Sequence, residues 1–386
     1  MVSSIWPLKE NYKAMKNLMI ITITFLFIAC NTTHKEKTKQ IPDYKIELGK
    51  VARHAVFSGG DTVSHWGGSV VKGKDGLYHM LYARWPKKIG WEWVNYSEIA
   101  HAIAKSPFGP YKHVGIALPE RSTDYWDGSA THNPTIHKFN GKYYLYYMGN
   151  VGDKKIVSVP GKARINWTHR NNQRIGVAVA DDPSGPWKRF PNPVLDITHN
   201  DSTAHDALMT SNPSVCQMPD GKILMIYKAV GKQFSLPQGG PVVHMVAIAD
   251  NPTGPFTKYP NPIFLEEGVR FPAEDPYIWY ADGKYRAIVK YIQHQGKRRI
   301  FSLVHYDSTN GIDWKKAKNF HISDRTVTWQ DGTTQQFDHL ERPQVLIEDG
   351  KPIALICAAD IYDENYVRQS FNIQIPIIIK KEYPKQ

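Results

Sequence analysis

The hydrophobic pattern of the chain repeats five times along its length. Each copy has a short polar opening, an apolar strand, a turn that ends in glycine and a second apolar strand, as in "HNPTIHKFNGKYYLYYMG" from His132. The other copies begin at Trp66, Ser211, Glu274 and Glu341. The turn glycines are Gly76, Gly141, Gly221, Gly283 and Gly350. Because a tight hairpin turn needs a positive φ, each of these glycines indicates a β-hairpin.

A second motif alternates with the first. "AHAIAKSPFGPY", "GVAVADDPSGPW" and "VAIADNPTGPF", with a looser copy in "VHYDSTNGIDW", each combine an alternating strand, a Pro/Gly turn and an aromatic residue that opens the next strand. One repeat is therefore four strands joined by hairpins. Four antiparallel strands recurring about every 60–80 residues predict an all-β fold, a five-bladed β-propeller of four-stranded antiparallel blades.

The fifth repeat lacks a clear copy of the second motif. We expect "SFNIQIPIII" from Ser370 and part of the N-terminal segment "YKIELGKVARHAVFSGG" to complete this blade. A pair of β-sandwiches is the alternative fold, but it does not explain five copies of both motifs in the same order.

The N-terminal 30 residues are typical of a secretory signal peptide. The apolar run "NLMIITITFLFIAC" follows Lys13 and Lys16 and ends at Cys30. Its ending approximates a lipoprotein box, which predicts that Cys30 is lipidated and anchors the chain to the outer membrane of a Gram-negative cell envelope. A transmembrane anchor is the alternative, although the run is short for a span. Residues 31–45 are polar and predict a tether, which leaves 46–380 as one propeller domain.

The net charge of +12 is the next constraint. Nucleic acid is not the expected partner, because Lys and Arg are scattered and no reading motif is present. An anionic polysaccharide is a better match for an exported basic protein, since a basic cleft concentrates uronates or sulfates; surface solubility is the other explanation. Cys216 and Cys357 lie in apolar strands and are expected to be core thiols. No organic cofactor is expected, and a cation in the central channel is compatible with the pattern although ligand spacing is lacking. A monomer or weak dimer is expected.

The polar openings of the repeats supply the candidate chemistry. Aligned on the turn glycines, the openings are Trp66-Gly67, His132-Asn133, Ser211-Asn212, Glu274-Asp275 and Glu341-Arg342. The first strand of a blade lines the central channel, so five openings should converge at one mouth. Asp61, Asp127, His205, Asp206 and His339 stand nearby in the sequence. Cleavage of a glycosidic bond needs one carboxylic acid and one carboxylate, and repulsion and burial would separate their pKa values.

Each candidate also has a structural explanation. Asp127 could cap a turn, and Glu341 and Arg342 could simply pair with each other or with neighbouring blades. His132 and His339 could be structural histidines, and one of the two acids in the fourth opening is expected to bond backbone between blades. The loop "ARWPKKIGWEWVNYSE" contains Trp91 and two further tryptophans. Sugar rings stack on exposed indole faces, so this loop is a candidate substrate contact.

The ordered motifs resemble a known family. "WGGSVVKG", "YWDGSATHNPTIHKFNGKYYLYYMGN", "FPAEDPYIWY" and "HLERPQVLIEDGKP" are similar to the five-bladed propeller glycoside hydrolases near families 43 and 117, from about Val51 to Ala359. The resemblance implies an exo-acting, mostly inverting enzyme with an aspartate base, a glutamate or histidine acid and a third, orienting carboxylate. In family 43 the base lies in the first opening, where this chain has Gly67. The fifth-blade cluster of family 117 falls on His339 and Glu341.

These observations lead to one main hypothesis, an exo-glycosidase for oligosaccharides of an anionic plant or algal polysaccharide. Glu341 or His339 would be the acid, Asp127 or Asp61 the base, and Asp275 an orienting carboxylate. Substrate contacts would come from Trp66 at the pocket floor and from His132, Asn133, Asn212, Glu274, Arg342 and Trp91. A glycoside phosphorylase and a non-catalytic glycan-binding lipoprotein are the alternative functions.

Overall fold

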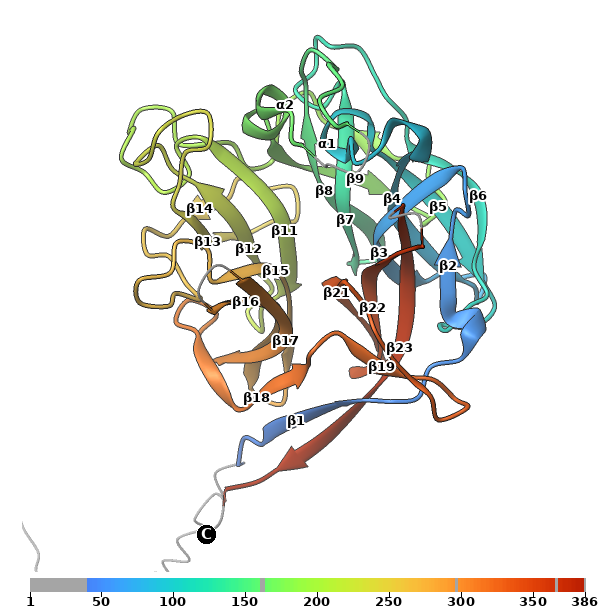
Figure 1. Ribbon diagram of the computed structural model, residues 1–386. Coiled ribbons are helices and arrows are strands. Elements are labelled where there is room, and N and C mark those ends of the chain that lie inside the picture. Colours follow the sequence, from blue (N-terminus) through green and yellow to red (C-terminus); the bar gives the residue numbers. More distant parts are fainter. Residues whose placement is uncertain (1–39, 160–163, 296–297, 365–366, 385–386) are drawn as a thin grey trace, which may run out of the picture. The chain divides into compact units, whose positions relative to one another are not determined.

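Five antiparallel sheets surround a common axis. The structure, a computed structural model, describes residues 40–159, 164–295, 298–364 and 367–384. The first strands of the sheets contact one another in chain order, and the fifth contacts the first, which closes the ring. The predicted five-bladed β-propeller is therefore confirmed (Figure 1).

The first four blades are each built from consecutive strands of the chain. Blade 1 contains β3 (Val63–Lys72), β4 (Tyr78–Pro86), β5 (Glu98–Ala104) and β6 (Lys112–Leu118). Blade 2 contains β7 (Ala130–Phe139), β8 (Lys142–Asn150), β9 (Arg174–Ala180) and β10 (Lys188–Arg189). Blade 3 contains β11 (Met209–Gln217), β12 (Ile223–Val230), β13 (Val242–Ala249) and β14 (Thr257–Lys258). Blade 4 contains β15 (Ala273–Ala281), β16 (Lys284–Gln295), β17 (Arg298–Ser308) and β18 (Lys315–Ser323).

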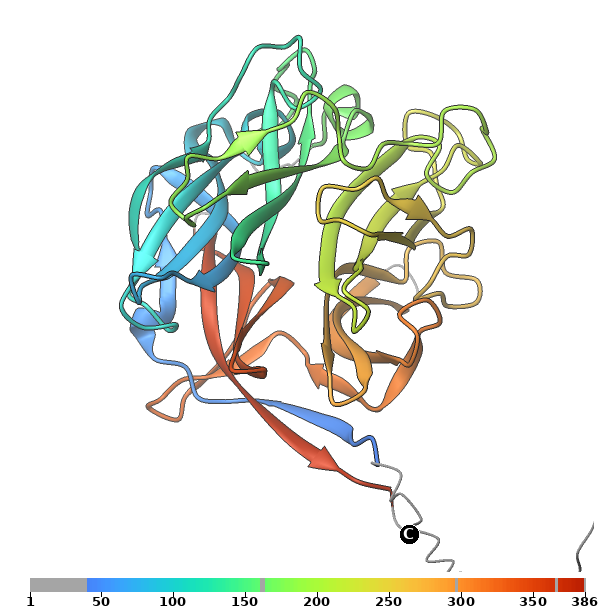
Figure 2. The same ribbon diagram turned by 180° about the vertical axis from the view of Figure 1, so that it is seen from behind.

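Blade 5 joins the two ends of the described residues. It contains β21 (His339–Glu348), β22 (Lys351–Tyr362) and β23 (Arg368–Glu382), and the N-terminal strand β1 (Asp43–Leu48) pairs antiparallel with the end of β23. The short β2 (Val56–Ser58) pairs with the beginning of β23. This closure by both predicted segments is visible from behind (Figure 2). Strand β1 begins inside the segment predicted as a tether, and β23 continues beyond residue 380.

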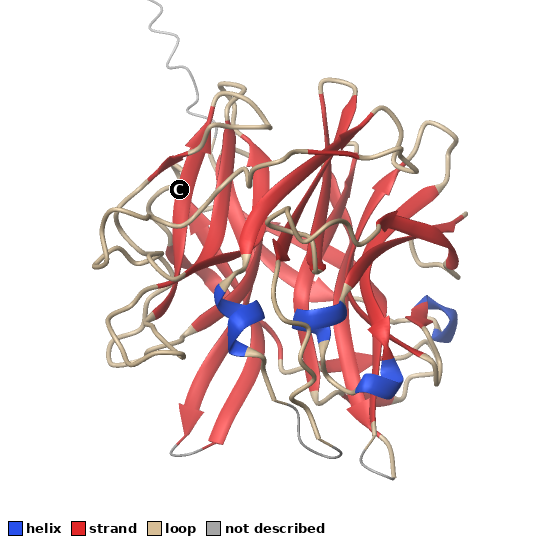
Figure 3. Cartoon of the chain, turned by 90° about the horizontal axis from the view of Figure 1, so that it is seen from above, coloured by secondary structure: helices blue, strands red, loops and turns tan. Residues whose placement is uncertain are grey.

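Few helical turns accompany the strands (Figure 3). They are η1 (Arg53–Ala55), η2 (Lys87–Ile89), α1 (Trp93–Tyr96) and α2 (Trp167–Asn171), and a small hairpin is formed by β19 (Thr326–Thr328) and β20 (Thr334–Gln336). Among the described residues, no helix is long and apolar enough to span a membrane. The predicted lipidation site, Cys30, lies outside the described residues.

The core consists of apolar clusters, most of them between neighbouring blades. Leu355 and Ile373 of blade 5 pack with Ile288 of blade 4, and Met225 of blade 3 packs with Tyr146 of blade 2. Full burial of each such side chain contributes about 2 kcal/mol. Cys216 and Cys357 are buried free thiols, as expected, and burial raises the pKa of both.

A β-bulge recurs at the same place in every inner strand. The register between the first and second strands shifts at each polar opening, for example between His132 and Thr135. One residue in each opening has a positive φ of 49° to 55°: Gly67, Asn133, Asn212, Asp275 and Arg342. A bulge re-aims side chains locally, so five equivalent bulges turn one residue per blade in the same way. The predicted turn glycines also have positive φ.

Candidate active site

The bulge residues form a polar ring around the propeller axis. Asn133 Nδ2 donates to Asn212 Oδ1 at 2.9 Å, and Asn212 Nδ2 donates to Asp275 Oδ1 at 2.5 Å. Arg342 Nη1 lies 3.7 Å from the same Asp275 oxygen, and Arg342 Nη2 donates to the main-chain oxygen of Asn133 at 2.7 Å. These four side chains are buried. The ring is thus a hydrogen-bonded layer across the axis, and it unites predicted residues from four blades.

Gly67 is the member of the ring without a side chain. A Cβ at Gly67 would lie 3.1 Å from Arg342 Cγ and 3.1 Å from Asn133 Oδ1. Arg342 and Asn133 therefore occupy the space beside the first opening. The aspartate that the resemblance to family 43 implies at this position is absent, and its space is filled.

Two carboxylates from blades 4 and 5 meet two lysines beside the ring. Lys228 Nζ lies 2.8 Å from Glu274 Oε1, and Lys290 Nζ lies 2.8 Å from Glu274 Oε2. Lys290 also forms an ion pair with Glu341. The second strands β12 and β16 supply the lysines, which pair in register with Ser211 and Glu274. Lys290 therefore connects the openings of two blades.

This charge cluster separates the pKa values of its acids. Burial opposes ionisation of Glu274, but attraction to Lys228 and Lys290 outweighs burial and lowers the pKa of Glu274 far below its ordinary value. Burial, together with repulsion from Glu274, raises the pKa of Asp275 to about 6. At neutral pH Glu274 is consequently an anion fixed by two cations, whereas Asp275 binds a proton as the pH falls toward 6.

A second polar group lies at the opening of blade 5. His339 Nδ1 lies 2.8 Å from Asp360 Oδ1, and Arg368 forms an ion pair with the other Asp360 oxygen. The Arg368 guanidinium lies 3.4 Å from the ring centroid of Trp91 and 5.3 Å from that of Trp66. The Asp360 side chain is fully buried, whereas 26% of the His339 side chain is exposed. Asp360 therefore orients an imidazole that remains accessible.

Phe301 joins the two polar groups. Its ring lies 5.6 Å from the His339 ring, and Lys290 Nζ lies 5.0 Å from its centroid. His339 and Glu341 are two residues apart on β21, before the bulge. Alternate residues of a strand point to the same face. His339 and Glu341 therefore lie on one face, next to the cluster around Lys290.

His132 is held among other side chains at the second opening. Ser97 Oγ lies 2.7 Å from His132 Nδ1, and the Trp93 ring stacks on the imidazole at 4.6 Å. Burial, with a smaller contribution from Arg342, lowers the pKa of His132 well below its ordinary value. His132 is therefore a neutral, buried neighbour of the ring.

The connections between the second and third strands of the blades lie at the same end of the propeller axis as the bulges. In blade 4, β16 and β17 continue their pairing past Ala273, and in blade 5, β22 and β23 continue past Asp360. The longer connections of blades 1, 2 and 3 are joined to each other: Asn95 Nδ2 donates to the main chain of Lys155, and Arg170 Nη1 donates to that of Gln238. These segments form the walls around the bulge end of the axis.

Both carboxylate oxygens of Asp127 are bonded to side chains of blade 2 and of the segment that precedes it. Arg121 Nε donates to Asp127 Oδ1 at 2.6 Å, Tyr147 donates to Oδ2 at 2.7 Å, and Arg189 Nη1 lies 3.4 Å from Oδ2. Asp206 repeats this arrangement six residues before the bulge of blade 3, where Tyr227 and Lys258 are its partners. The repeated contacts tie a second strand to a fourth strand.

The first-blade candidate Asp61 also lies apart from the axial cluster. Its side chain is 99% exposed, and its ion-pair partner is Lys87 at 3.6 Å. The two aspartates predicted as possible bases therefore have contacts that differ from those of Glu274, Asp275 and Glu341, which the fold brings together.

Four charged residues of the cluster were not predicted from the sequence. They are Lys228, Lys290, Asp360 and Arg368. A signal was present for both lysines, since "LMIYKAV" and "AIVKYI" each place one lysine inside an otherwise apolar strand. Such a residue is rarely buried unless it is paired. Among the described residues, no group of three or more His, Cys, Asp or Glu side chains could hold a metal ion.

Comparison with known proteins gives one family and many similar structures. Residues 109–212 match the model of glycosyl hydrolases family 43. No curated protein sequence matches significantly. Among solved structures, Zg3597, a family 117 glycoside hydrolase of the marine bacterium Zobellia galactanivorans, is 18% identical with a TM-score of 0.55, covering 88% of this chain and 91% of that one.

Two further structures have the same fold. A complex of BT0996 with RGII is 14% identical with a TM-score of 0.57, covering 90% of this chain and 94% of the other. An endo-arabinase of Bacteroides thetaiotaomicron VPI-5482 is 13% identical with a TM-score of 0.51, covering 88% of this chain and all of the other (100%). These likenesses show that the chain has the fold of five-bladed propeller glycoside hydrolases, and residues 109–212 match the family 43 model.

Proposed function

We propose that the chain is an exo-acting glycoside hydrolase that releases a terminal sugar from oligosaccharides of an anionic plant or algal polysaccharide. The observation that carries this proposal is the convergence of Glu274, Asp275, Glu341 and His339 at the bulge end of the axis. Hydrolysis of a glycosidic bond requires an acid and a base on either side of the bond, and this cluster supplies both kinds of group.

His339 is the proposed general acid and Glu341 the proposed base. Asp360 accepts the Nδ1 proton of His339, which leaves Nε2 to carry a proton to the leaving oxygen. Glu341 is held through one oxygen by Lys290, and its other oxygen can activate water. A base that activates water, rather than attacking the sugar itself, is the arrangement of an inverting enzyme. We therefore expect inversion at the anomeric carbon.

Exo-action is supported by the walls of the site. The long hairpins of blades 4 and 5 and the joined loops of blades 1 to 3 surround the bulge end. Walls on all sides favour a pocket that admits a chain end over a groove that a polymer crosses. A pocket of this kind would accept one terminal residue.

An anionic substrate is supported by the cations at the opening. Arg368 stacks on Trp91, and its Nη2 lies 3.4 Å from His339 Nδ1; the chain carries a net charge of +12. An arginine fork recognises carboxylates and sulfates well. Similar structures include a complex with RGII and a family 117 enzyme of a marine bacterium, which agrees with plant or algal glycans.

The decisive experiment is a screen of defined oligosaccharides, with product analysis by chromatography and NMR. The proposal predicts that only monosaccharide appears at early times, with the inverted anomer first, and that uronate- or sulfate-bearing substrates are preferred. Early release of larger fragments would reject exo-action. Equal rates on neutral and anionic substrates would reject the substrate class.

A glycoside phosphorylase remains the second candidate, because Arg342 fills the place of the usual base and cations are numerous in the cluster. The same screen, run with and without inorganic phosphate, separates the two functions. A hydrolase gives the free sugar at equal rates in both buffers, whereas a phosphorylase gives a sugar 1-phosphate and depends on phosphate.

We also propose that Cys30 carries a lipid that anchors the enzyme to the outer membrane. The support is the apolar run that ends in "FIAC". Labelling of cells with radioactive palmitate should mark the wild-type chain and leave Cys30→Ser unlabelled and released from membranes. Equal labelling of both chains would refute the anchor.

A further inference from the structure

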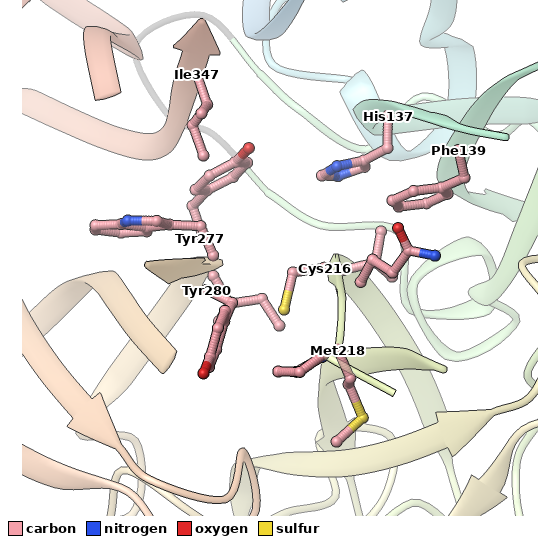
Figure 4. Close-up of a pocket in the computed structure, with 12 residues that line it drawn as sticks. His137, Phe139, Cys216, Met218, Tyr277, Tyr280 and Ile347 are labelled. Atoms are coloured by element: carbon pink, nitrogen blue, oxygen red, sulfur yellow. The ribbon is translucent and has the colours of Figure 1, made fainter. Parts of the chain in front are cut away.

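A cavity opens at the end of the axis opposite to the bulges. Its volume is about 300 Å³. It is lined by the far ends of four inner strands: His137 and Phe139 of β7, Cys216 and Gln217 of β11, Tyr277 and Tyr280 of β15, and Ile347 of β21. We call it the distal cavity, and Figure 4 shows His137, Phe139, Tyr277 and Cys216 gathered around it.

The distal cavity is separate from the charge cluster. From Asn133 in the ring to Phe139 at the cavity the inner strand advances by six residues, which is about 20 Å at about 3.3 Å per residue. The hydrogen-bonded ring lies between the two ends. A glycan therefore cannot contact both sites by passing along the axis.

The lining of the distal cavity combines aromatic rings with uncharged polar groups. The His137 ring stacks on Phe139 at 5.6 Å with an interplanar angle of 5°, and on Tyr277 at 6.1 Å and 14°. Burial lowers the pKa of His137 to about 3, so this ring is neutral. Trp279 also lines the cavity, and its buried indole N–H has no partner among the described residues. Gln217 and Tyr280 are exposed at the rim.

We propose that the distal cavity binds one uncharged sugar residue of a glycan, without catalysing a reaction. Aromatic faces cover the apolar C–H faces of a sugar ring, and the amide of Gln217 and the tyrosine hydroxyls are suited to its hydroxyls. The volume is at the lower end for ligand pockets, which fits one ring. None of the lining residues carries a charge, so a uronate or sulfate would lose its solvation without gaining a partner. This inference relies on the proposed function only in taking glycans as the ligands of the chain.

Saturation-transfer NMR with methyl glycosides tests the distal cavity. The probes are the methyl glycosides of galactose, glucose, xylose and arabinose, with methyl glucuronide as the charged probe. The wild type should bind at least one neutral probe and bind methyl glucuronide more weakly at this site. Tyr280→Ala should weaken the neutral probe about tenfold, as expected for losing one aromatic contact. Gln217→Ala, at an exposed strand end, tests the same site without touching the core.

Two controls separate this inference from the proposed catalytic function. Tyr383→Ala removes another exposed tyrosine, outside the cavity, and should leave binding unchanged. Glu341→Gln, in the axial cluster, should also retain binding of the neutral probe. Failure of all four neutral probes to bind would overturn the proposal, as would binding that survives both cavity variants or that disappears only in Glu341→Gln. Each of these results is independent of whether the enzyme turns over a substrate.

Discussion

Arg342 is the long side chain at the bulge position of an inner strand, where the other blades carry short side chains or none. The other ring members with side chains are two asparagines and an aspartate, and Gly67 provides the space for the longer arginine. A glycine is needed at position 67 for two separate reasons, because its φ is +55° and because a Cβ would meet Arg342 and Asn133 at 3.1 Å. These two contributions can be measured separately.

Gly67→Ala should lower the free energy of unfolding by about 2 kcal/mol, with about 1 kcal/mol from the positive φ and a similar amount from the close contacts. The matched control is Gly141→Ala, at φ +81° with no atom within 4 Å of the added Cβ. Gly141→Ala should lose only the about 1 kcal/mol of stability that comes from the positive φ. Urea denaturation measures both. An equal loss in the two variants would show that Arg342 and Asn133 do not fill the space beside Gly67.

Asp275 should give the protein a pH-dependent stability. Its pKa is raised to about 6, so between about pH 4 and 6 the folded state holds a proton that the unfolded chain releases. Stability from this group is complete at low pH and is lost as the pH rises through 6. Between pH 5 and 7 the wild type should lose about 1 kcal/mol that Asp275→Asn does not lose.

Denaturant titrations at pH 5, 6 and 7 measure this difference. Buried histidines such as His65, whose pKa burial lowers to about 4, contribute stability that increases with pH, but they do so in both proteins. Subtracting the free energy of unfolding of the variant from that of the wild type at each pH therefore isolates the contribution of Asp275. Parallel curves would mean that Asp275 is not protonated in the folded state near pH 6.

At the scale of strands, the repeated aspartates act as connections inside blades. Asp127 binds Tyr147 on a second strand and Arg189 on a fourth strand, and Asp206 binds Tyr227 and Lys258 in the same way. This equivalence between blades 2 and 3 indicates a role in folding, because the partners of both aspartates join strands within a blade and are not members of the axial cluster.

Asp127→Asn should therefore lower the free energy of unfolding by about 3 kcal/mol, since it leaves two partly buried arginines without the countercharge of a fully buried carboxylate. The folded fraction should keep the kcat of the wild type. Asp206→Asn should behave similarly, and Asp61→Asn, at an exposed site, should change stability by less than about 0.5 kcal/mol. Calorimetry and kinetics on the same preparations provide the check. A large loss of kcat in stable Asp127→Asn would return this residue to the catalytic candidates.

Many of the strands and turns were predictable from repeated local sequence patterns. The turn glycines, the apolar strands and the N- and C-terminal closure of blade 5 follow from signals that lie within a few residues of each other. The position of Asp127 was not predictable, because nothing local distinguishes an aspartate near the axis from one that ties strands together. Lys290 was also missed, since its partners Glu274 and Glu341 come from different repeats and become neighbours only when the ring closes.

For the whole molecule, the five bulges are the feature that turns a repeated fold into a site. They aim one residue per blade at the axis, and the differences among the five copies give the ring its chemistry. The cluster is balanced in charge: Glu274, Asp275, Glu341 and Asp360 face Lys228, Lys290, Arg342 and Arg368. Such a balanced network can hold ionised groups out of bulk water, which preorganises the site before substrate arrives.

The catalytic role of this axial cluster is tested most directly by the kcat/KM of Glu341→Gln on the substrate that the wild type cleaves fastest, with the fold checked by circular dichroism and denaturant midpoint. The expected result is a loss of about 10³-fold with an unchanged fold, as for removal of a general acid or base. A kcat/KM within about threefold of the wild type would contradict the assignment.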